Sequence, residues 1–188
     1  FLGEGDKVKV TIRFRGRDPL TRVDRVIITD DFDYVPTEGN TDAFPGDVWP
    51  SNPFYDFIEA LARNEITSGC SNHFYCPAAP VTRAQMAVML LKSMYGSDYV
   101  PPPATGTVFS DVPRTAFAAA WIEQLADEGV TSGCGGVRGP RYCPNESVTR
   151  AQMAVFLLRA EHGSNYVPPA PTGVFDDLDL DDPFAPWI

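Results

Sequence analysis

An internal repeat constrains the fold of this chain more than any other feature of its sequence. Residues 47–70 read DVWPSNPFYDFIEALARNEITSGC, and residues 111–134 read DVPRTAFAAAWIEQLADEGVTSGC. The stretch VTRAQMAV then follows at residues 81–88 and again, unchanged, at residues 148–155. Repetition at this length is typical of stacked supersecondary units, none of which buries a sufficient core alone.

The first half of each repeat predicts an amphipathic helix. Apolar residues recur at helical spacing on one face, namely Phe54, Phe57, Ile58 and Leu61 in the first copy and Phe117, Trp121, Ile122 and Leu125 in the second. Gly129 is expected to end the second of these helices, with Asn64 as the left-handed cap of the first. Because Asp47, Asp111 and Asp177 each precede a predicted helix, we expect them to cap that helix or to bond within a turn.

The stretch VTRAQMAV predicts the start of a second helix in each repeat. Thr82 and Thr149 are expected at the N-cap, with Gln85 and Gln152 at the third helical position. This spacing is the reciprocal capping box, and one cap stabilises a helix by about 1 kcal/mol. The apolar residues that follow are expected in the core, namely Met86, Ala87, Leu90, Leu91 and Met94 in the first copy and Met153, Ala154, Leu157 and Leu158 in the second.

Capping leaves the two arginines of this stretch unexplained. Arg83 and Arg150 fall at the first helical position, where the macrodipole disfavours a cation by roughly 0.3–1 kcal/mol. A guanidinium beside free backbone N–H groups suits an anionic ligand such as a carboxylate, a pyruvate ketal or a phosphate. The alternative is structural: each arginine packs on an aromatic ring of a neighbouring repeat, or pairs with Asp47 or Asp111.

The four cysteines form two matched pairs, Cys70 with Cys76 and Cys134 with Cys143. Each pair predicts a local disulfide that adds about 2 kcal/mol of stability, and such pairing indicates an oxidising, extracellular compartment. The spacing of Cys70, His73 and Cys76 also fits metal ligation. The second loop has no histidine, and the first offers only three ligands. We therefore expect no metal site.

Composition excludes several classes of function. The chain has 15 Lys and Arg against 25 Asp and Glu, a formal charge of −10, which argues against general nucleic-acid binding. No apolar run approaches the roughly 20 residues needed to cross a bilayer, so we expect no membrane span. Neither a catalytic triad nor a phosphate-binding glycine loop is present, so we expect no enzyme activity and no cofactor.

The repeats and the segments between them give a domain division. We assign a β-strand segment at 1–35, a linker at 36–46, a first repeat at 47–97, a Pro-rich linker at 98–108, a second repeat at 109–163, a Pro-rich linker at 164–174 and a truncated third repeat at 175–188. Strict alternation in DKVKVTIRFRGR predicts one strand, and RVDRVIITDD predicts another. No charged-then-apolar leader follows Phe1, so we expect any export signal to lie upstream.

The repeated pattern resembles the S-layer homology domain in a cysteine-bearing form, over roughly residues 44–188. The resemblance implies a mainly α fold of tandem helix–loop–helix repeats, non-covalent binding of a secondary cell-wall polymer, and a location on the bacterial surface. The family's ligand-contacting Thr-Arg-Ala-Glu motif maps to Thr82–Gln85 and Thr149–Gln152, with Gln in place of Glu in both copies. The predicted ligand-binding residues are Thr82, Arg83, Gln85, Thr149, Arg150, Gln152 and Trp121, although Trp121 also suits a core position.

Two shorter resemblances concern the N-terminal segment. Residues 1–17 are similar to a strand of the C-terminal domain of translation initiation factor three, and residues 21–38 resemble the closing strand of a secreted carbohydrate-binding jelly roll. Two further hypotheses follow beside wall attachment. The first is homotypic assembly through the incomplete third repeat, and the second is RNA or ribosome binding by the basic strand at 7–17.

Overall fold

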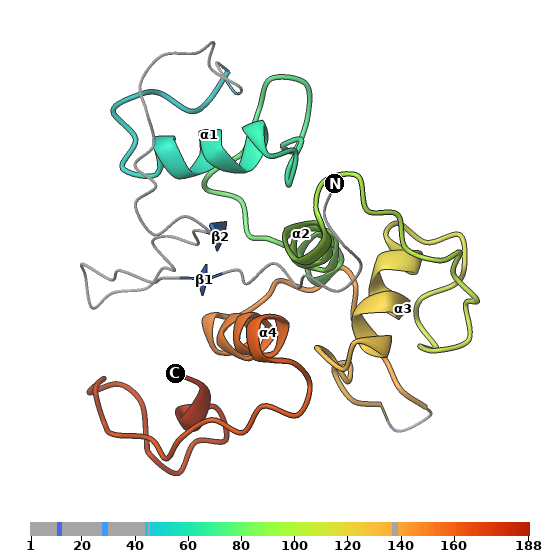
Figure 1. Ribbon diagram of the computed structural model, residues 1–188, viewed down its shortest axis with the longest axis vertical. Helices are drawn as coiled ribbons and strands as arrows, with labels where there is room; N and C mark the ends of the chain where they lie inside the picture. Colours follow the sequence, from blue (N-terminus) through green and yellow to red (C-terminus); the bar gives the residue numbers. More distant parts are fainter. Residues whose placement is uncertain (1–10, 13–27, 30–43, 45, 137–138) are drawn as a thin grey trace, which may run out of the picture. The chain divides into compact units, whose positions relative to one another are not determined.

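The computed structural model describes residues 11–12, 28–29, 44, 46–136 and 139–188. These residues form four α-helices, α1 (Tyr55–Arg63), α2 (Arg83–Tyr95), α3 (Ala119–Asp127) and α4 (Arg150–His162), and a short 3-10 helix, η1 (Ala185–Trp187) (Figure 1). Strand β1 (Thr11–Ile12) pairs antiparallel with β2 (Ile28–Thr29), and each lies inside one of the two predicted strands. The predicted mainly helical fold is confirmed. Most of the N-terminal segment, with its two resemblances, lies outside the described residues.

The chain divides into two compact units, and the division falls within α2. The first unit comprises Phe1–Ala79 and Leu91–Tyr99, and the second comprises Pro80–Leu90 and Val100–Ile188. Helix α2 therefore contributes its N-terminal half to one unit and its C-terminal half to the other.

Equivalent residues form a small core in each unit. Phe44, Val48 and Ile58 are buried in the first unit, and Phe109, Val112 and Ile122 are buried in the second. The ring of Phe44 packs on Tyr75 with centroids 5.3 Å apart, and the ring of Phe109 packs on Tyr142 at 5.4 Å. Each core thus joins the turn before a helix to the loop after it.

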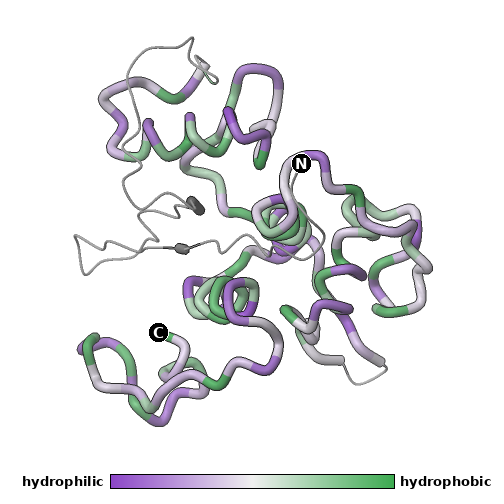
Figure 2. Tube along the Cα trace, viewed as in Figure 1, coloured by the Kyte–Doolittle hydropathy of each residue, from purple (hydrophilic) through white to green (hydrophobic). Residues whose placement is uncertain are grey.

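The predicted apolar face of the second repeat's first helix is wrong at one residue. Phe117 is 69% exposed because α3 begins at Ala119, with Ala118 as its N-cap. Ile122 and Leu125 are buried as predicted, and Trp121 is half-buried. Hydrophobic and hydrophilic residues are interspersed along α1 and α3, as in short amphipathic helices (Figure 2).

Helices α1 and α3 end in the same way, and this corrects the predicted cap of α1. In α3, Gly129 has φ +70 and Val130 N–H donates to Leu125 O at 3.2 Å, the bond pattern of a Schellman motif. In α1 the left-handed residue is Glu65, with φ +55, while Asn64 has φ −85. The prediction for Asn64 was wrong by one residue, since Glu65 is the equivalent of Gly129.

The helices that begin with the repeated motif bury much of their predicted faces. Met86, Ala87, Leu90 and Leu91 of α2 are buried, as predicted, whereas Met94 is half-buried. In α4, Leu157 is buried as predicted, and the other predicted core positions are half-buried. Phe156, which was not predicted in the core, is buried as well. Within the described part of the chain, none of the helices combines the length and apolar composition required to cross a membrane.

Candidate functional site

Both predicted capping boxes are present. In α4, Gln152 N–H donates to Thr149 Oγ1 at 3.2 Å and Thr149 N–H donates to Gln152 Oε1 at 3.3 Å. In α2 the corresponding distances, between Gln85 and Thr82, are 3.2 and 2.9 Å. The helices therefore begin at Arg83 and Arg150, as the sequence predicts.

The two helix N-termini differ in what their next N–H groups bind. In α2, Arg83 N–H donates to Glu146 O at 2.8 Å, and Ala84 N–H donates to Pro144 O at 3.0 Å. In α4, within the residues that the structure describes, the N–H groups of Arg150 and Ala151 have no partner. The N-terminus of α4 thus retains free N–H donors for an anion, whereas backbone carbonyls of repeat 2 accept hydrogen bonds from the corresponding N–H groups of α2.

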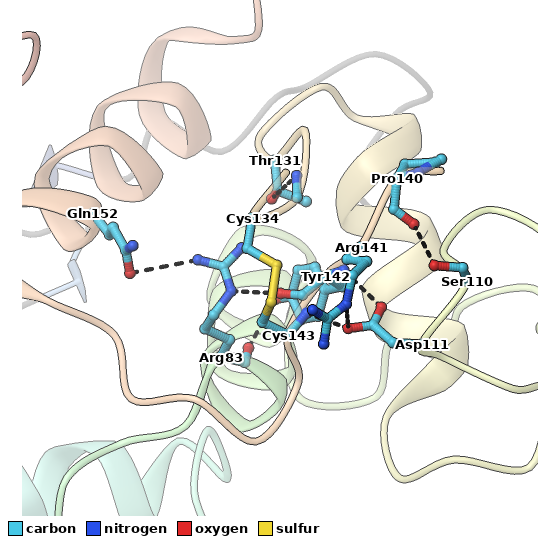
Figure 3. Close-up of a disulfide and its surroundings, with 11 residues drawn as sticks. Arg83, Ser110, Asp111, Thr131, Cys134, Pro140, Arg141, Tyr142, Cys143 and Gln152 are labelled. Carbon is cyan, nitrogen blue, oxygen red and sulfur yellow. Dashed lines mark hydrogen bonds and ion pairs between the residues drawn. A yellow bond between two sulfur atoms is a disulfide. The ribbon is translucent and has the colours of Figure 1, made fainter. Parts of the chain in front are cut away.

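Arg83 is enclosed by the disulfide loop of repeat 2 (Figure 3). Its side chain and backbone are 3% exposed, and its Nε donates to Tyr142 O at 2.7 Å. Its guanidinium carbon lies 4.8 Å from the centroid of the Tyr142 ring, within cation–π range. Tyr142 Oη in turn donates to Arg83 O at 2.8 Å. Arg83 therefore makes the packing contact with an aromatic ring that was the alternative interpretation of its position.

Arg83 also brings the two copies of the motif together. Its Nη1 lies 3.5 Å from Gln152 Oε1, and Val148 N–H donates to Val81 O at 3.0 Å beside it. Figure 3 shows the guanidinium between Gln152 and Tyr142. The buried Nη2 has no hydrogen-bond partner among the described residues.

Arg150 has a different environment from Arg83, despite the identical local sequence. It is exposed, and among the described residues its guanidinium forms neither an ion pair nor a hydrogen bond. Its N-cap neighbour Thr149 is exposed as well. Of the predicted ligand-binding residues, Thr82, Arg83 and Gln152 lie together, Arg150 faces solvent, and Trp121 lies on α3.

The sequence did not reveal the role of the aspartate that opens each repeat. Asp47 accepts hydrogen bonds from Tyr75 N–H at 2.8 Å and Cys76 N–H at 2.6 Å. Asp111 accepts from Tyr142 N–H at 2.8 Å and Cys143 N–H at 2.9 Å. The predicted helix-capping or turn role of both was wrong, because each carboxylate binds the Tyr-Cys backbone of its own disulfide loop. The only trace of this contact in the sequence is that both repeats have an Asp at the start and a Tyr-Cys pair in the later loop.

These contacts change the ionisation of the groups involved. Burial raises the pKa of Asp111, but the Tyr142 and Cys143 N–H groups and the nearby Arg141 guanidinium outweigh it, so the pKa lies below its ordinary value. Burial raises the pKa of the Tyr142 hydroxyl, and the nearby Arg83 charge offsets only part of that rise. Tyr142 is therefore a neutral hydrogen-bond donor at physiological pH.

Both predicted disulfides are present, with Cα atoms 6.0 Å apart for Cys70–Cys76 and 6.1 Å apart for Cys134–Cys143. The ligand atoms of Asp111, Cys134 and Cys143 lie within 4.8 Å of one another. Since the two sulfurs are bonded to each other, neither is a thiolate, the form of cysteine that binds metals.

A carboxylate also fixes the Pro-rich segment before repeat 2. Glu123 on α3 accepts from Thr105 N–H and Gly106 N–H, both at 2.7 Å, and from the Thr105 hydroxyl. Burial acts to raise the pKa of Glu123, yet these hydrogen bonds bring it below the ordinary value. The contact positions the linker on the helix that follows it.

Each repeat is thus a small helix–loop–helix module. A disulfide and an aspartate hold its loop together, and its second helix begins with a capping box and an arginine. The family model of the S-layer homology domain matches residues 47–87. Residues 47–87 therefore match an S-layer homology domain, a non-catalytic class of domain that anchors proteins at the cell surface.

Similar proteins include both enzymes and a surface protein. The exoglucanase XynX of Acetivibrio thermocellus is 33% identical over 105 residues, which cover 56% of this chain and 9% of the relative. An endoglucanase of Bacillus sp. (strain KSM-635) is 30% identical over 128 residues, 65% of this chain and 12% of the relative. The cell surface protein of Thermoanaerobacter kivui is 29% identical over 116 residues, 61% of this chain and 15% of the relative. The chain spans only these small fractions of the curated relatives it matches.

Proposed function

We propose that this chain attaches an exported bacterial protein to the cell envelope by binding an anionic group of a wall glycan at the N-terminus of α4. The observation that carries this proposal is Arg150, an exposed guanidinium next to two N–H groups that have no partner among the described residues. A carboxylate or phosphate can accept hydrogen bonds from the guanidinium and from the backbone N–H groups at the same time. The S-layer homology match supports the anchoring role.

The two arginines of the repeated motif have separate roles in this proposal. Arg83 holds the second helix of repeat 1 against the disulfide loop of repeat 2, through Tyr142. Arg150 contacts the glycan. Thr149 and Gln152 support Arg150 indirectly, because their capping box fixes the turn from which the free N–H groups project.

A sedimentation assay with purified cell-wall material tests the proposal. We expect Arg150→Ala to reduce the bound fraction strongly while the melting temperature stays within a degree or two, because the side chain is exposed. Arg114→Ala is the matched control, since it removes an exposed arginine from the same repeat. Equal bound fractions for the Arg150→Ala and Arg114→Ala variants would contradict binding at the N-terminus of α4.

A second comparison separates the polymer's anionic group from the rest of the wall. We expect that mild acid hydrolysis, which removes secondary polymers, abolishes retention of the unaltered chain. Retention that survives this treatment would point to the peptidoglycan itself and would contradict an anionic polymer as the ligand.

The two other hypotheses have less support. No contact among the described residues supports self-association through repeat 3, and the basic strand at 7–17 is described only at Thr11 and Ile12.

A further inference from the structure

A cavity of about 530 Å³, wide open to solvent, lies beside the disulfide loop of repeat 1. Its lining residues are Phe44, Ala62, Ser68, Gly69, Cys70, Ser71, Asn72 and His73. None of them is an Asp, Glu, Lys or Arg, and the volume falls in the range of small-molecule sites, about 300–1,000 Å³. All of its lining residues belong to the first unit.

Repeat 2 provides an internal reference for this loop, since the same backbone bonds define equivalent positions. Cys70 N–H donates to Phe74 O at 2.9 Å, as Cys134 N–H donates to Arg141 O at 2.7 Å. Gly46 N–H donates to His73 O at 3.1 Å, as Ser110 N–H donates to Pro140 O at 2.9 Å. Phe74 is therefore equivalent to Arg141, and His73 to Pro140.

The lining residues of the cavity divide into two groups by this comparison. Phe44, Ala62, Ser68 and Gly69 have the equivalents Phe109, Ala126, Ser132 and Gly133, so the fold of the loop accounts for them. Ser71, Asn72 and His73 have glycines or proline in their place, namely Gly135, Gly136 and Pro140. Repeat 2 closes a disulfide loop that is three residues longer, with a cysteine separation of 9 against 6, and it has no hydroxyl, amide or imidazole at these positions. Closure of such a loop therefore does not require these side chains.

The backbone at His73 strengthens this conclusion. Its φ is +63, a left-handed conformation that costs a residue with a Cβ free energy, and Pro140 cannot adopt it. Glycine would relieve that strain at no loss of packing, because His73 is exposed. Residues held in such conformations concentrate at ligand sites.

The loop of repeat 1 has no counterpart of the Arg141 guanidinium, since Phe74 takes its place. Arg141 Nε lies 3.5 Å from Asp111 Oδ2, whereas repeat 1 has an aromatic ring that is 44% exposed and packs against Gly46. The lining itself offers a hydroxyl, an amide and an imidazole and no charged side chain. These groups have the chemistry that recognises the hydroxyl edges of a sugar.

We propose that this cavity is a binding site for a neutral saccharide unit, held by hydrogen bonds from Ser71, Asn72 and His73. The site goes beyond the proposed anion site, and it operates whether or not Arg150 binds a wall polymer.

Titration of the full chain with neutral disaccharides, followed by NMR or calorimetry, tests the proposal. Cellobiose, maltose and N,N′-diacetylchitobiose are suitable probes. We expect at least one of them to bind, and the variants Asn72→Gly and His73→Gly to lower its affinity by about tenfold or more. Because His73→Gly removes a left-handed strain, its melting temperature should equal or exceed that of the unaltered chain.

The choice of variants keeps folding and binding apart. Arg150→Ala should leave disaccharide affinity unchanged, and Phe117→Ala, which removes an exposed aromatic of repeat 2, should do the same. Absence of binding by all three disaccharides at millimolar concentration would overturn the proposal. Equal affinity in the unaltered chain and in His73→Gly would overturn it as well. Neither result bears on wall retention through Arg150.

Discussion

At the residue scale, Arg83 and Arg150 show that an identical octapeptide places its arginine in two environments. Helix α2 uses Arg83 as a packing residue, with a guanidinium over Tyr142 and a carbonyl that accepts the tyrosine hydroxyl. The same local signals give both helices their capping boxes. The difference comes from residues about 60 positions away, which no local pattern reveals.

Substitution of Arg83 should therefore affect stability. We expect Arg83→Ala to lower the free energy of unfolding by about 2 kcal/mol, because the buried Tyr142 carbonyl then loses its hydrogen bond from a charged donor. Tyr142→Phe should cost about 1 kcal/mol through loss of the bond to Arg83 O. Urea unfolding measures both, with Arg150→Ala expected within about 0.5 kcal/mol of the unaltered chain. Equal losses for Arg83→Ala and Arg150→Ala would contradict the division of roles.

Glu65 gives a second prediction at this scale. It has φ +55 at the position where α3 has Gly129, so glycine should fit better. We expect Glu65→Gly to raise the free energy of unfolding by about 1 kcal/mol, the usual cost of a left-handed residue with a Cβ. Glu65→Ala keeps the Cβ and is the matched control, so a similar gain from alanine would show that the cause is charge and not backbone conformation.

At the element scale, the sequence predicted helix starts and disulfides well and the links between elements poorly. A capping box depends only on two residues three positions apart, such as Thr149 and Gln152. Both helix starts could therefore be predicted from the sequence. Asp111 binds N–H groups 31 and 32 residues later, across a helix and a loop, and a one-dimensional pattern holds no direct trace of that contact. Phe117 was placed on the wrong side because α3 begins only at Ala119, after Ala118 in a left-handed conformation that the periodic pattern does not reveal.

The aspartate that closes the second loop should make stability depend on pH. Its pKa is lowered in the folded chain, so its contribution is complete above its unfolded pKa of about 3.9 and is lost as the pH falls through the lower folded value. We expect Asp111→Asn to cost about 2 kcal/mol at pH 7, with a loss that shrinks below pH 4. Thermal unfolding from pH 7 to pH 3 measures this, and a loss that is constant across that range would contradict the carboxylate's role.

At the scale of the whole molecule, charge opposes the function that the α4 site supports. The chain has a formal charge of −10, so an anionic polymer repels it at long range, while Arg150 attracts one group at short range. Mobile ions screen the long-range term first, since the Debye length falls from about 30 Å at 0.01 M salt to about 8 Å at 0.15 M.

Wall retention should therefore pass through a maximum as salt is added. We expect the bound fraction to rise between about 0.01 and 0.15 M salt as repulsion is screened, and to fall towards 1 M as the contact with Arg150 weakens. The sedimentation assay at these concentrations measures the profile, with Arg150→Ala expected to be low throughout and Arg114→Ala to follow the unaltered chain. A steady fall from the lowest salt would mean that local attraction dominates at every range, and a curve insensitive to salt would argue against an ionic contact at α4.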